Sequence, residues 1–419
     1  MNKNCAFTIC TKSYMGLAKI LESSIYKYDA NVDFYIFIAD ELNKNINIPS
    51  NAIVVKSLNI FSENVWKELS FKYDVTEFCT CLKPFIFEWL FKNKMYEKLT
   101  YLDPDLFFFN SIDMIYKSMD NGLITLTPHF ITFPGNSISN LFEDEIRYTG
   151  LYNLGFLGLK RSTKVFQMLN WWKNNLISKC FVEPTMFQFT DQKWMDWMPG
   201  LLSNEHLYIS HDLGMNMAPW NYFERELFKK DDTLYVRFRT NDNPQHEFRL
   251  VFIHFAGYDY HKMKQGFIVR KRIENLQEYK DLHLATDIYC KAIANNKDIF
   301  DEFITLPYTY SSYDNGIPIS TFHRRLYHGY SEKYGPVRNP FSTNKESFYS
   351  MIKKKGMIIN DNIDKISKLN LSNMDRKRKM IGMLFCVLYK FMGYKRYVLF
   401  VKSLYNYCRP EWHLFLIRK

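Results

Sequence analysis

Apolar and polar residues near the start of the chain follow patterns that predict a strand, a helix and a second strand. Residues 5–10, "CAFTIC", are rich in β-branched and aromatic side chains, as is typical of a short buried strand. Residues 14–29 place apolar side chains at helical spacing, and residues 32–41, "VDFYIFIADE", predict a strand that ends in two acids. Because strand, helix and strand within about forty residues form a βαβ unit, we expect the sheet to begin parallel.

The later pattern continues this alternation. Helices are predicted at 80–94 and 163–179, and strands at 98–109, 122–129, 152–161 and 249–259. Beyond the last strand the chain reads as helical and polar, without an internal repeat. The pattern as a whole predicts an α/β fold.

The predicted strand "KLTYLDPDLFFF" (98–109) carries two carboxylates, Asp103 and Asp105, between apolar runs. In extended chain, residues i and i+2 point to the same side, and Pro104 restricts the backbone between them. The end of a strand in an α/β sheet is where ligands bind. A divalent cation, Mg²⁺ or Mn²⁺, would neutralise both acids and hold substrate phosphates. A solvated Asp-Pro-Asp turn is the alternative, and the acid pair alone favours it.

Five motifs change this balance. In order, "YLDPDLFFF", "YNLGFLGL", "FTDQKWMDWMP", "MNMAPWNYFER" and "HFAGYDYHK" resemble bacterial surface-polysaccharide glycosyltransferases of the GT-A fold, which are related in outline to retaining galactosyl- and glucosyltransferases. The resemblance covers roughly residues 4–265 and is specific through the shared order of the motifs. It implies a GT-A-like (Rossmann-like) nucleotide-sugar-binding domain at 1–270 with a mixed, mainly parallel sheet. A helical accessory region at 271–350 and a basic amphipathic C-terminal region at 351–419 are expected to follow.

The resemblance also implies a metal site. Asp103 and Asp105 would bind Mn²⁺ or Mg²⁺ on the nucleotide diphosphate, and His254 would complete the site. Two carboxylates with an imidazole suit Mn²⁺ somewhat better than Mg²⁺.

The family follows this histidine with a glycine and then Lys-Pro. Here Gly257 is in place, but the basic residues are His261, Lys262 and Lys264, without the proline. We expect Gly257 and Lys262 to contact the donor.

In "TDQKWMD" the resemblance implies two catalytic residues. Asp191 would bind sugar hydroxyls, and Gln192 would face the anomeric carbon and stabilise an oxocarbenium-like transition state during front-side attack with retention. The alternative is a polar helix N-terminus that Thr190 caps. Both interpretations can hold together.

Further donor contacts follow from the resemblance. Thr11 and Tyr14 would hold the ribose and base, Lys83 the phosphate or sugar, and Asn153 and Gly155 would line the sugar site. A surface lysine and an asparagine in a turn are the ordinary alternatives. The segment "NMAPWNYFER" adds three candidates, with Trp220 either a sugar platform or a core residue: Asn216, Trp220 and Asn221.

The net charge of +11 belongs to one end of the chain. Residues 351–419 hold 16 Lys and Arg against 4 Asp and Glu, whereas the rest holds 39 and 40. This distribution argues against nucleic acid as a partner of the main body. Within 373–407, basic clusters alternate with apolar segments, which predicts contact with an anionic membrane surface. The alternative is a helical subdomain that buries its apolar stripe on the body.

The cysteines and the N-terminus bear on location. The eight cysteines form no CxxC pair. The apolar stretch at the start of the sequence is too short for a signal peptide. No apolar run reaches the roughly 18 residues that a membrane-spanning helix needs. We therefore expect a cytoplasmic protein that is peripheral on the inner face of the cytoplasmic membrane.

These features predict a metal-dependent glycosyltransferase. Its partners would be a nucleotide-sugar donor, with UDP-linked sugars among the options, and a glycan or lipid-linked glycan acceptor. One alternative is a phosphohydrolase of the HAD type with Asp103 as nucleophile, although Phe107 and the late position of the strand speak against it. Another is an inactive scaffold in glycan assembly.

Overall fold

The computed structural model describes residues 3–42, 46–133, 145–240, 246–268, 279–359 and 374–417. The chain divides into two compact units. The first, here the sheet unit, comprises residues 1–60 and 76–308, and the second, the helical unit, comprises 61–75 and 309–419. The predicted boundary between 270 and 271 lies outside the described residues.

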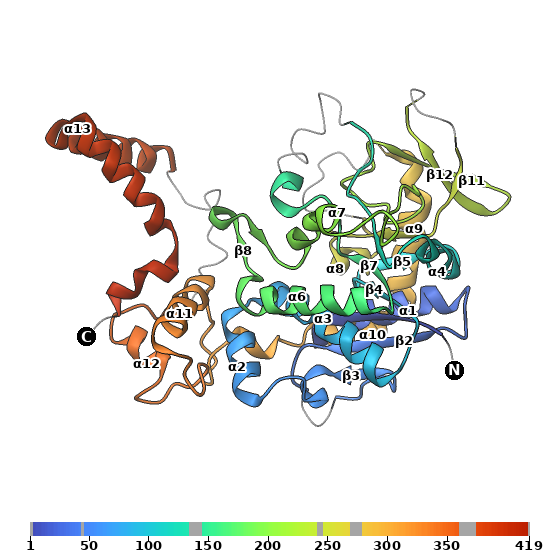
Figure 1. The fold of residues 1–419 in the computed structure, drawn as a ribbon, viewed down its shortest axis with the longest axis horizontal. Coiled ribbons are helices and arrows are strands. Elements are labelled where there is room, and N and C mark those ends of the chain that lie inside the picture. The colour runs from blue at the N-terminus through green and yellow to red at the C-terminus, as the bar shows by residue number, and fades with distance from the viewer. Residues whose placement is uncertain are drawn as a thin grey trace. The chain divides into compact units, whose positions relative to one another are not determined.

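A seven-stranded sheet forms the centre of the sheet unit (Figure 1), in the order β10-β6-β7-β4-β1-β2-β3. Its pairs are parallel except those that β7 makes with β4 and β6. The predicted α/β fold is therefore confirmed, with a mixed, mainly parallel sheet. The strands are β1 (Asn4–Cys10), β2 (Asp33–Ile38), β3 (Ala52–Val54), β4 (Lys98–Leu102), β6 (Ile124–Leu126), β7 (Phe156–Lys160) and β10 (Leu207–Ile209).

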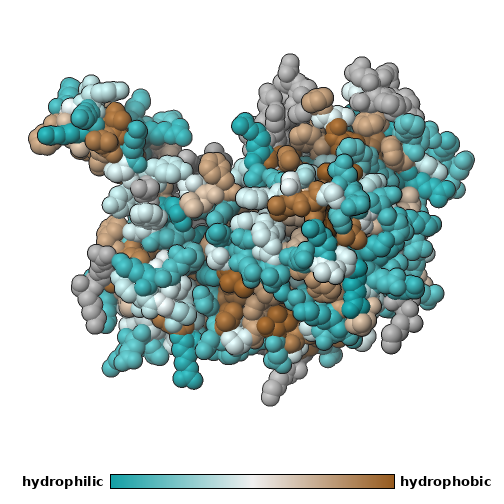
Figure 2. Space-filling model, in the orientation of Figure 1, coloured by the Kyte–Doolittle hydropathy of each residue, from teal (hydrophilic) through white to brown (hydrophobic). Residues whose placement is uncertain are grey.

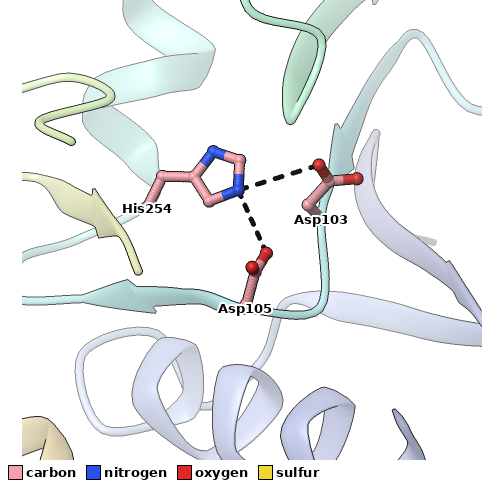
Figure 3. A group of neighbouring side chains, drawn as sticks. All are labelled: Asp103, Asp105 and His254. Atoms are coloured by element: carbon pink, nitrogen blue, oxygen red, sulfur yellow. Dashed lines mark ion pairs between the residues drawn. The ribbon is translucent and has the colours of Figure 1, made fainter. Parts of the chain in front are cut away.

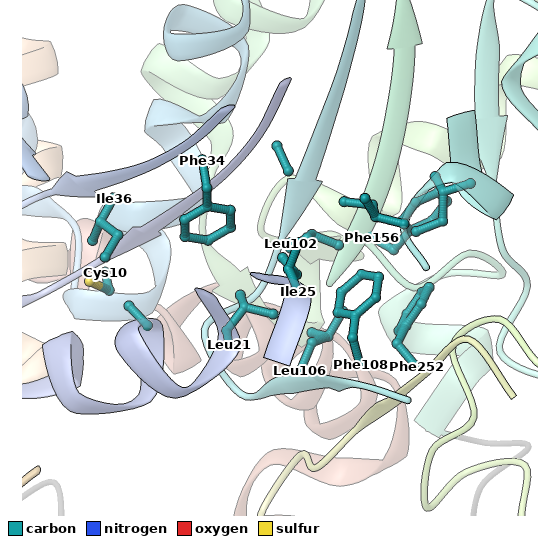
Figure 4. Packing of buried hydrophobic residues seen from close by; sticks show 14 of the residues in the cluster. Cys10, Leu21, Ile25, Phe34, Ile36, Leu102, Leu106, Phe108, Phe156 and Phe252 are labelled. Atoms are coloured by element: carbon teal, nitrogen blue, oxygen red, sulfur yellow. The ribbon is translucent and has the colours of Figure 1, made fainter. Parts of the chain in front are cut away.

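Helices cover both faces of this sheet because side chains alternate along its strands. Phe34 and Ile36 of β2 pack with Leu21 and Ile25 of α1 (Met15–Tyr26), as Figure 4 shows. On the other face, Phe7 of β1 contacts α3 (Val75–Asn93). Further helices of this unit are α4 (Asp113–Ser118), α6 (Thr163–Lys179), α7 (Met198–Leu201), α8 (Tyr260–Met263), α9 (His283–Asn295) and α10 (Lys297–Ile304).

The segment 98–109 is not one strand, which corrects the prediction from its apolar pattern. Strand β4 ends at Leu102, and the chain turns through Asp103 to Asp105, with the Leu106 N–H donating to the Asp103 carbonyl at 3.2 Å. Strand β5 (Leu106–Phe108) then leaves the central sheet and pairs antiparallel with β14 (Phe252–His254). Pro104 lacks the N–H that a continuous ladder would use, so the chain turns there.

Three strands form a separate sheet, which the sequence pattern did not predict. They are β11 (Arg225–Lys230), β12 (Thr233–Phe238) and β13 (Phe248–Arg249), paired antiparallel. A further antiparallel pair joins β8 (Val182–Glu183) and β9 (Gln188–Phe189).

The helical unit confirms the predicted helical C-terminal extension. Its helices are α2 (Glu63–Lys72), α11 (Thr321–Tyr334), α12 (Phe348–Lys353) and α13 (Met374–Leu404). At its centre the buried Arg324 guanidinium donates to the carbonyls of Phe71 (2.6 Å), Tyr73 (2.8 Å) and Tyr310 (2.6 Å). One side chain thus joins α11 to the end of α2. Among the described residues, no helix is long and apolar enough to cross a membrane.

Replacing this arginine should destabilise the helical unit. We expect Arg324→Met to lower the free energy of unfolding by about 3 kcal/mol, because three buried carbonyls lose their donors. Urea unfolding followed by tryptophan fluorescence measures the change. Arg338→Met, at an exposed arginine of the same unit, is the matched control and should stay within about 0.5 kcal/mol. Equal effects of the two variants would contradict the role of Arg324.

Candidate metal centre

Three side chains from distant parts of the sequence meet at the end of β4. One ligand atom from each of Asp103, Asp105 and His254 lies within 4.8 Å of the others. Figure 3 shows the His254 Nε2 atom facing both acids, at 3.1 Å from Asp105 Oδ1 and 3.8 Å from Asp103 Oδ2. The β5–β14 pairing produces this arrangement, because it sets His254 directly opposite Leu106.

The three groups are electrostatically interdependent. Burial alone would raise the pKa of Asp105, but the attraction and hydrogen bond of His254 hold that pKa below its usual value. Burial would likewise lower the pKa of His254, but Asp105 and then Asp103 raise it. Two carboxylate oxygens and one imidazole nitrogen within 4.8 Å are a donor set that fits Mn²⁺ or Mg²⁺.

Two tyrosines orient the carboxylates, and the sequence analysis missed both. The Tyr101 hydroxyl donates to Asp103 Oδ1, and the Tyr260 hydroxyl donates to Asp105 Oδ2 at 3.0 Å. Each acid therefore keeps one oxygen on a tyrosine and turns the other towards His254. Tyr101 lies two residues before Asp103 in a strand, so the sequence could have indicated that their side chains share one side. The Tyr260 contact spans 155 positions and leaves no local pattern in the sequence.

Lys83 and Asp191 form a buried ion pair next to the centre. Lys83 Nζ lies 2.8 Å from Asp191 Oδ2, donates to the Leu154 carbonyl at 2.8 Å, and sits 4.2 Å from the centre of the Tyr101 ring. Burial raises the pKa of Asp191, although Lys83 opposes that shift. Lys83 is thus not a surface lysine, and Tyr101 connects it to Asp103.

Gln192 and Asn153 are buried and hydrogen-bonded to one another and to the backbone. Gln192 Oε1 accepts from the Leu154 N–H at 3.0 Å, and its Nε2 donates to the Thr149 carbonyl at 3.1 Å. Asn153 Nδ2 donates to Gln192 Oε1 at 3.4 Å. The expected Thr190 cap is absent from this helical turn, since the Thr190 hydroxyl donates to Asp191 Oδ1 instead.

Gly155 lies against the histidine ring. A Cβ atom there would stand 2.4 Å from His254 Cε1 and 2.8 Å from Asn153 Oδ1. Its carbonyl accepts from the Asp103 N–H at 2.8 Å. The glycine therefore makes room for a candidate metal ligand and also fixes the start of the turn.

The expected nucleotide contacts lie at the end of β1 and after β14. Thr11 is buried with its hydroxyl 2.8 Å from Ser13 Oγ, whereas Tyr14 is 44% exposed. Burial and then the charge of Asp105 raise the pKa of Tyr14. Gly257 has a left-handed φ of 76° and is exposed, like Lys262 on α8.

The other basic residues and the "NMAPWNYFER" candidates are also placed. His261 is exposed, and Lys264 pairs with Asp301. Asn216 and Asn221 are buried, and the Asn216 side chain donates to Asn153 Oδ1 at 3.1 Å. Trp220 stands edge-on to the rings of His254 and His129, with 5.2 Å between centres in each case.

A pocket of about 280 Å³ lies at the carboxyl ends of β6 and β10, and His129 is among the residues that line it. Burial lowers the pKa of His129 to about 4, so its ring is neutral near pH 7. The pocket is mostly apolar and is lined by Pro128, His129, Phe130, Ile131, Ile146, Leu151, Tyr152, Ile209 and His211.

Comparisons with known proteins find relatives without an assigned activity. No family model matches the chain. It is similar to two uncharacterised proteins of Bacillus subtilis (strain 168). YfnF is 26% identical over 290 residues, covering 67% of this chain and 85% of YfnF, and YfnD is 23% identical over 256 residues, covering 60% and 76%.

Solved structures similar to this chain include glycosyltransferases. Galactosyltransferase LgtC with donor and acceptor sugar analogues matches at 13% identity and a TM-score of 0.37, over 73% of this chain and 97% of LgtC. Glycosyltransferase GlyE of Streptococcus pneumoniae TIGR4 matches at 13% identity and a TM-score of 0.38, over 75% and 67%. These enzymes are of the class that the sequence motifs resemble. Similarity at this level leaves the activity of this chain to be argued from its own residues.

Breaking the buried Lys83–Asp191 ion pair should lower the free energy of unfolding more than breaking an ion pair at the surface. We expect Lys83→Met to lower the free energy of unfolding by about 3–5 kcal/mol, because Asp191 is left buried without its partner. The double variant Lys83→Met with Asp191→Leu should recover most of that loss. Urea unfolding measures all three.

Lys92→Met is the control, because Lys92 lies on the same helix in an exposed pair with Glu88 and should cost less than about 1 kcal/mol. A double variant no more stable than Lys83→Met alone would refute the assignment of the loss to an unpaired Asp191.

Proposed function

We propose that this chain is a metal-dependent glycosyltransferase that moves a sugar from a nucleotide-sugar donor to a surface-glycan acceptor, such as a lipopolysaccharide or capsule precursor. The observation that carries the proposal is the convergence of Asp103, Asp105 and His254 within 4.8 Å at the end of a central strand. A centre of this kind suits a cation that binds a diphosphate. The adjoining Asp191 and Gln192 supply polar groups for a sugar.

The chemistry assigns a role to each part of the centre. A bound Mn²⁺ or Mg²⁺ supplies neutralisation of the diphosphate leaving group. Asp103 and Asp105, each turned by a tyrosine hydroxyl, present one oxygen to that position. Tyr14, whose ring is partly exposed, stacks on the nucleotide base, and a UDP-linked sugar is our first choice of donor.

The sugar is proposed to lie next to the Asp191–Gln192 segment. Asp191 binds sugar hydroxyls, and the Gln192 carbonyl, held in place by the Leu154 N–H at 3.0 Å, stabilises positive charge at the anomeric carbon. The transfer then proceeds with retention, which the coupling constant of the anomeric proton in the product tests. No observation favours the phosphohydrolase or the scaffold over this function.

A thermal-shift screen tests the donor and the metal together. We expect one nucleoside diphosphate or nucleotide sugar to raise Tm only when Mn²⁺ is present. The gain in stability should be about 2.7 kcal/mol at a hundred times the Kd, because the ligand binds only the folded state. The double variant Asp103→Asn with Asp105→Asn should abolish the shift, and the exposed Asp113→Asn should preserve it. A folded protein that no nucleotide shifts would refute the proposal in favour of the scaffold.

The proposal extends to helix α13 as the contact with an anionic lipid surface. Along Met374–Leu404 no side chain is buried, and Gly393, at a φ of 74°, divides the helix into two arms. Phe391 is 89% exposed and Val387 62%. In Figure 1 the arms are red, and Figure 2 shows hydrophobic and hydrophilic residues together on their surface.

Charge selects the partner of this exposed helix. The excess of 16 basic over 4 acidic residues in 351–419 attracts anionic headgroups and repels a second copy of the same region. Each basic residue near such a surface contributes about 1 kcal/mol, so a cluster is sufficient for reversible docking. The proposed site of action is the inner face of the cytoplasmic membrane, where a lipid-linked acceptor would be met.

Charge reversal on the first arm tests this contact. Replacing Arg376, Lys377, Arg378 and Lys379 by Glu should reduce sedimentation with phosphatidylserine liposomes at least about tenfold, because four charges change sign and the net charge near the surface falls by about eight units. Reversing four exposed lysines of the sheet unit, Lys27, Lys117, Lys164 and Lys179, is the matched control and should have a small effect. Equal losses in both variants would show a general charge effect and refute docking through α13.

A further inference from the structure

We infer that Asn153 is a positioning residue that fixes the tautomer of His254, aims its Nε2 atom at the candidate metal centre, and links that ligand to Gln192. The inference rests on the proposed metal centre only for its consequence in catalysis. The tautomer itself follows from hydrogen bonds among residues of this chain.

Two consecutive backbone amides settle which way both side-chain amides point. The Gly155 N–H donates to Asn153 Oδ1 at 3.2 Å, and the Leu154 N–H donates to Gln192 Oε1 at 3.0 Å. Because a backbone N–H can only donate, the atom that faces it must in each case be the oxygen. The nitrogen of Asn153 then faces Gln192 Oε1, at 3.4 Å.

The orientation of Asn153 determines the proton position on His254. His254 Nδ1 lies 3.2 Å from Asn153 Oδ1, an oxygen that also accepts from Asn216 Nδ2 at 3.1 Å. An amide oxygen cannot donate, so this contact requires a proton on Nδ1. The carboxylate of Asp105, at 3.1 Å, attracts a second proton to Nε2, which a bound cation would replace. Nε2 is therefore the nitrogen that faces Asp103 and Asp105 and can bind a cation there. Partners of this kind on the far nitrogen orient metal-ligating histidines in general.

Packing leaves the ring little freedom to choose another orientation. On one side, Gly155 is so close that an added Cβ would stand 2.4 Å from the ring. On another, Trp220 meets the ring edge-on at 89°. His254 is 5% exposed and Asn153 7%.

The Asn153 amide oxygen is also fully engaged. Its oxygen receives three contacts and its nitrogen one. We therefore assign Asn153 to positioning in place of the sugar contact expected from the resemblance. A single side chain then holds one proposed metal ligand and one proposed catalytic residue, so a change at Asn153 should reach both.

Two variants separate these tasks. Asn153→Leu removes both the acceptor for His254 and the donor to Gln192, whereas Asn153→Asp keeps the acceptor and loses the donor. We expect Asn153→Leu to weaken Mn²⁺ binding by about 10–100-fold in calorimetry, the usual cost of losing such a partner. Asn153→Asp should stay within about threefold of wild type in Mn²⁺ affinity and lose sugar transfer.

Gln192→Leu is the matched control, because it cuts the other end of the same hydrogen bond. Gln192→Leu should leave Mn²⁺ affinity unchanged. A hydrogen-bond network with only a structural role would instead lose Mn²⁺ affinity in both variants. Nitrogen-15 spectra of histidine-labelled, metal-free protein at pH 9, with His254 assigned through His254→Gln, give a second readout. Wild type and Asn153→Asp should carry the proton on Nδ1, and Asn153→Leu should not.

The outcomes distinguish this inference from the proposed function. A wild-type His254 with a proton on Nε2 alone, or a folded Asn153→Leu variant with wild-type Mn²⁺ affinity, would overturn the positioning role. If Asn153→Leu does not fold, loss of the Nδ1 proton in Asn153→Asp would overturn it. A wild type that binds no Mn²⁺ but shows the Nδ1 proton would remove the metal function and leave the tautomer assignment standing.

Discussion

The pairing of β5 with β14 is the constraint on which the rest of the candidate site depends. It places His254 opposite Leu106, one position after Asp105, so that an imidazole and two carboxylates can face one point. A slip of one residue would turn the ring to the opposite face of this small sheet. The turn at residues 103–105 is equally necessary, since it releases β5 from the central sheet. The Asp103 N–H fixes the start of this turn on the Gly155 carbonyl at 2.8 Å.

Around this pairing, hydrogen bonds and an ion pair fix the orientation of the charged side chains. Tyr101 and Tyr260 hold the two acids, and Lys83 holds Asp191. Such contacts offset part of the cost of bringing like charges together in a poorly hydrated place. They also set the direction of each oxygen before any ligand arrives, which reduces the reorganisation that binding or reaction would require.

The sequence predicted the local features well and the long-range ones poorly. β1, α1 and β2 follow from hydrophobic periodicity, which depends only on neighbouring residues. Asp103, Asp105 and His254 were expected to act together through the resemblance, and the structure brings them together. The break at Asp103 was missed because apolar residues on both sides read as one strand. The contacts that Tyr260 makes with Asp105 and Asn216 makes with Asn153 were missed because contacts between distant positions leave no periodic signal.

The segment "YNLGFLGL" shows how a short motif can be explained by packing. Asn153 accepts from His254, the Leu154 N–H holds Gln192, and Gly155 leaves space for the ring. The three positions have different roles: Asn153 acts through its side chain, Leu154 through its backbone N–H, and Gly155 through its lack of a side chain. Asn153 and Gly155 together therefore allow the His254 ring to pack against this strand with its Nε2 atom directed at the acids. We therefore propose that the main role of this motif is to position the metal centre. Its effect on the sugar would be indirect, through Gln192, which the same segment holds in place.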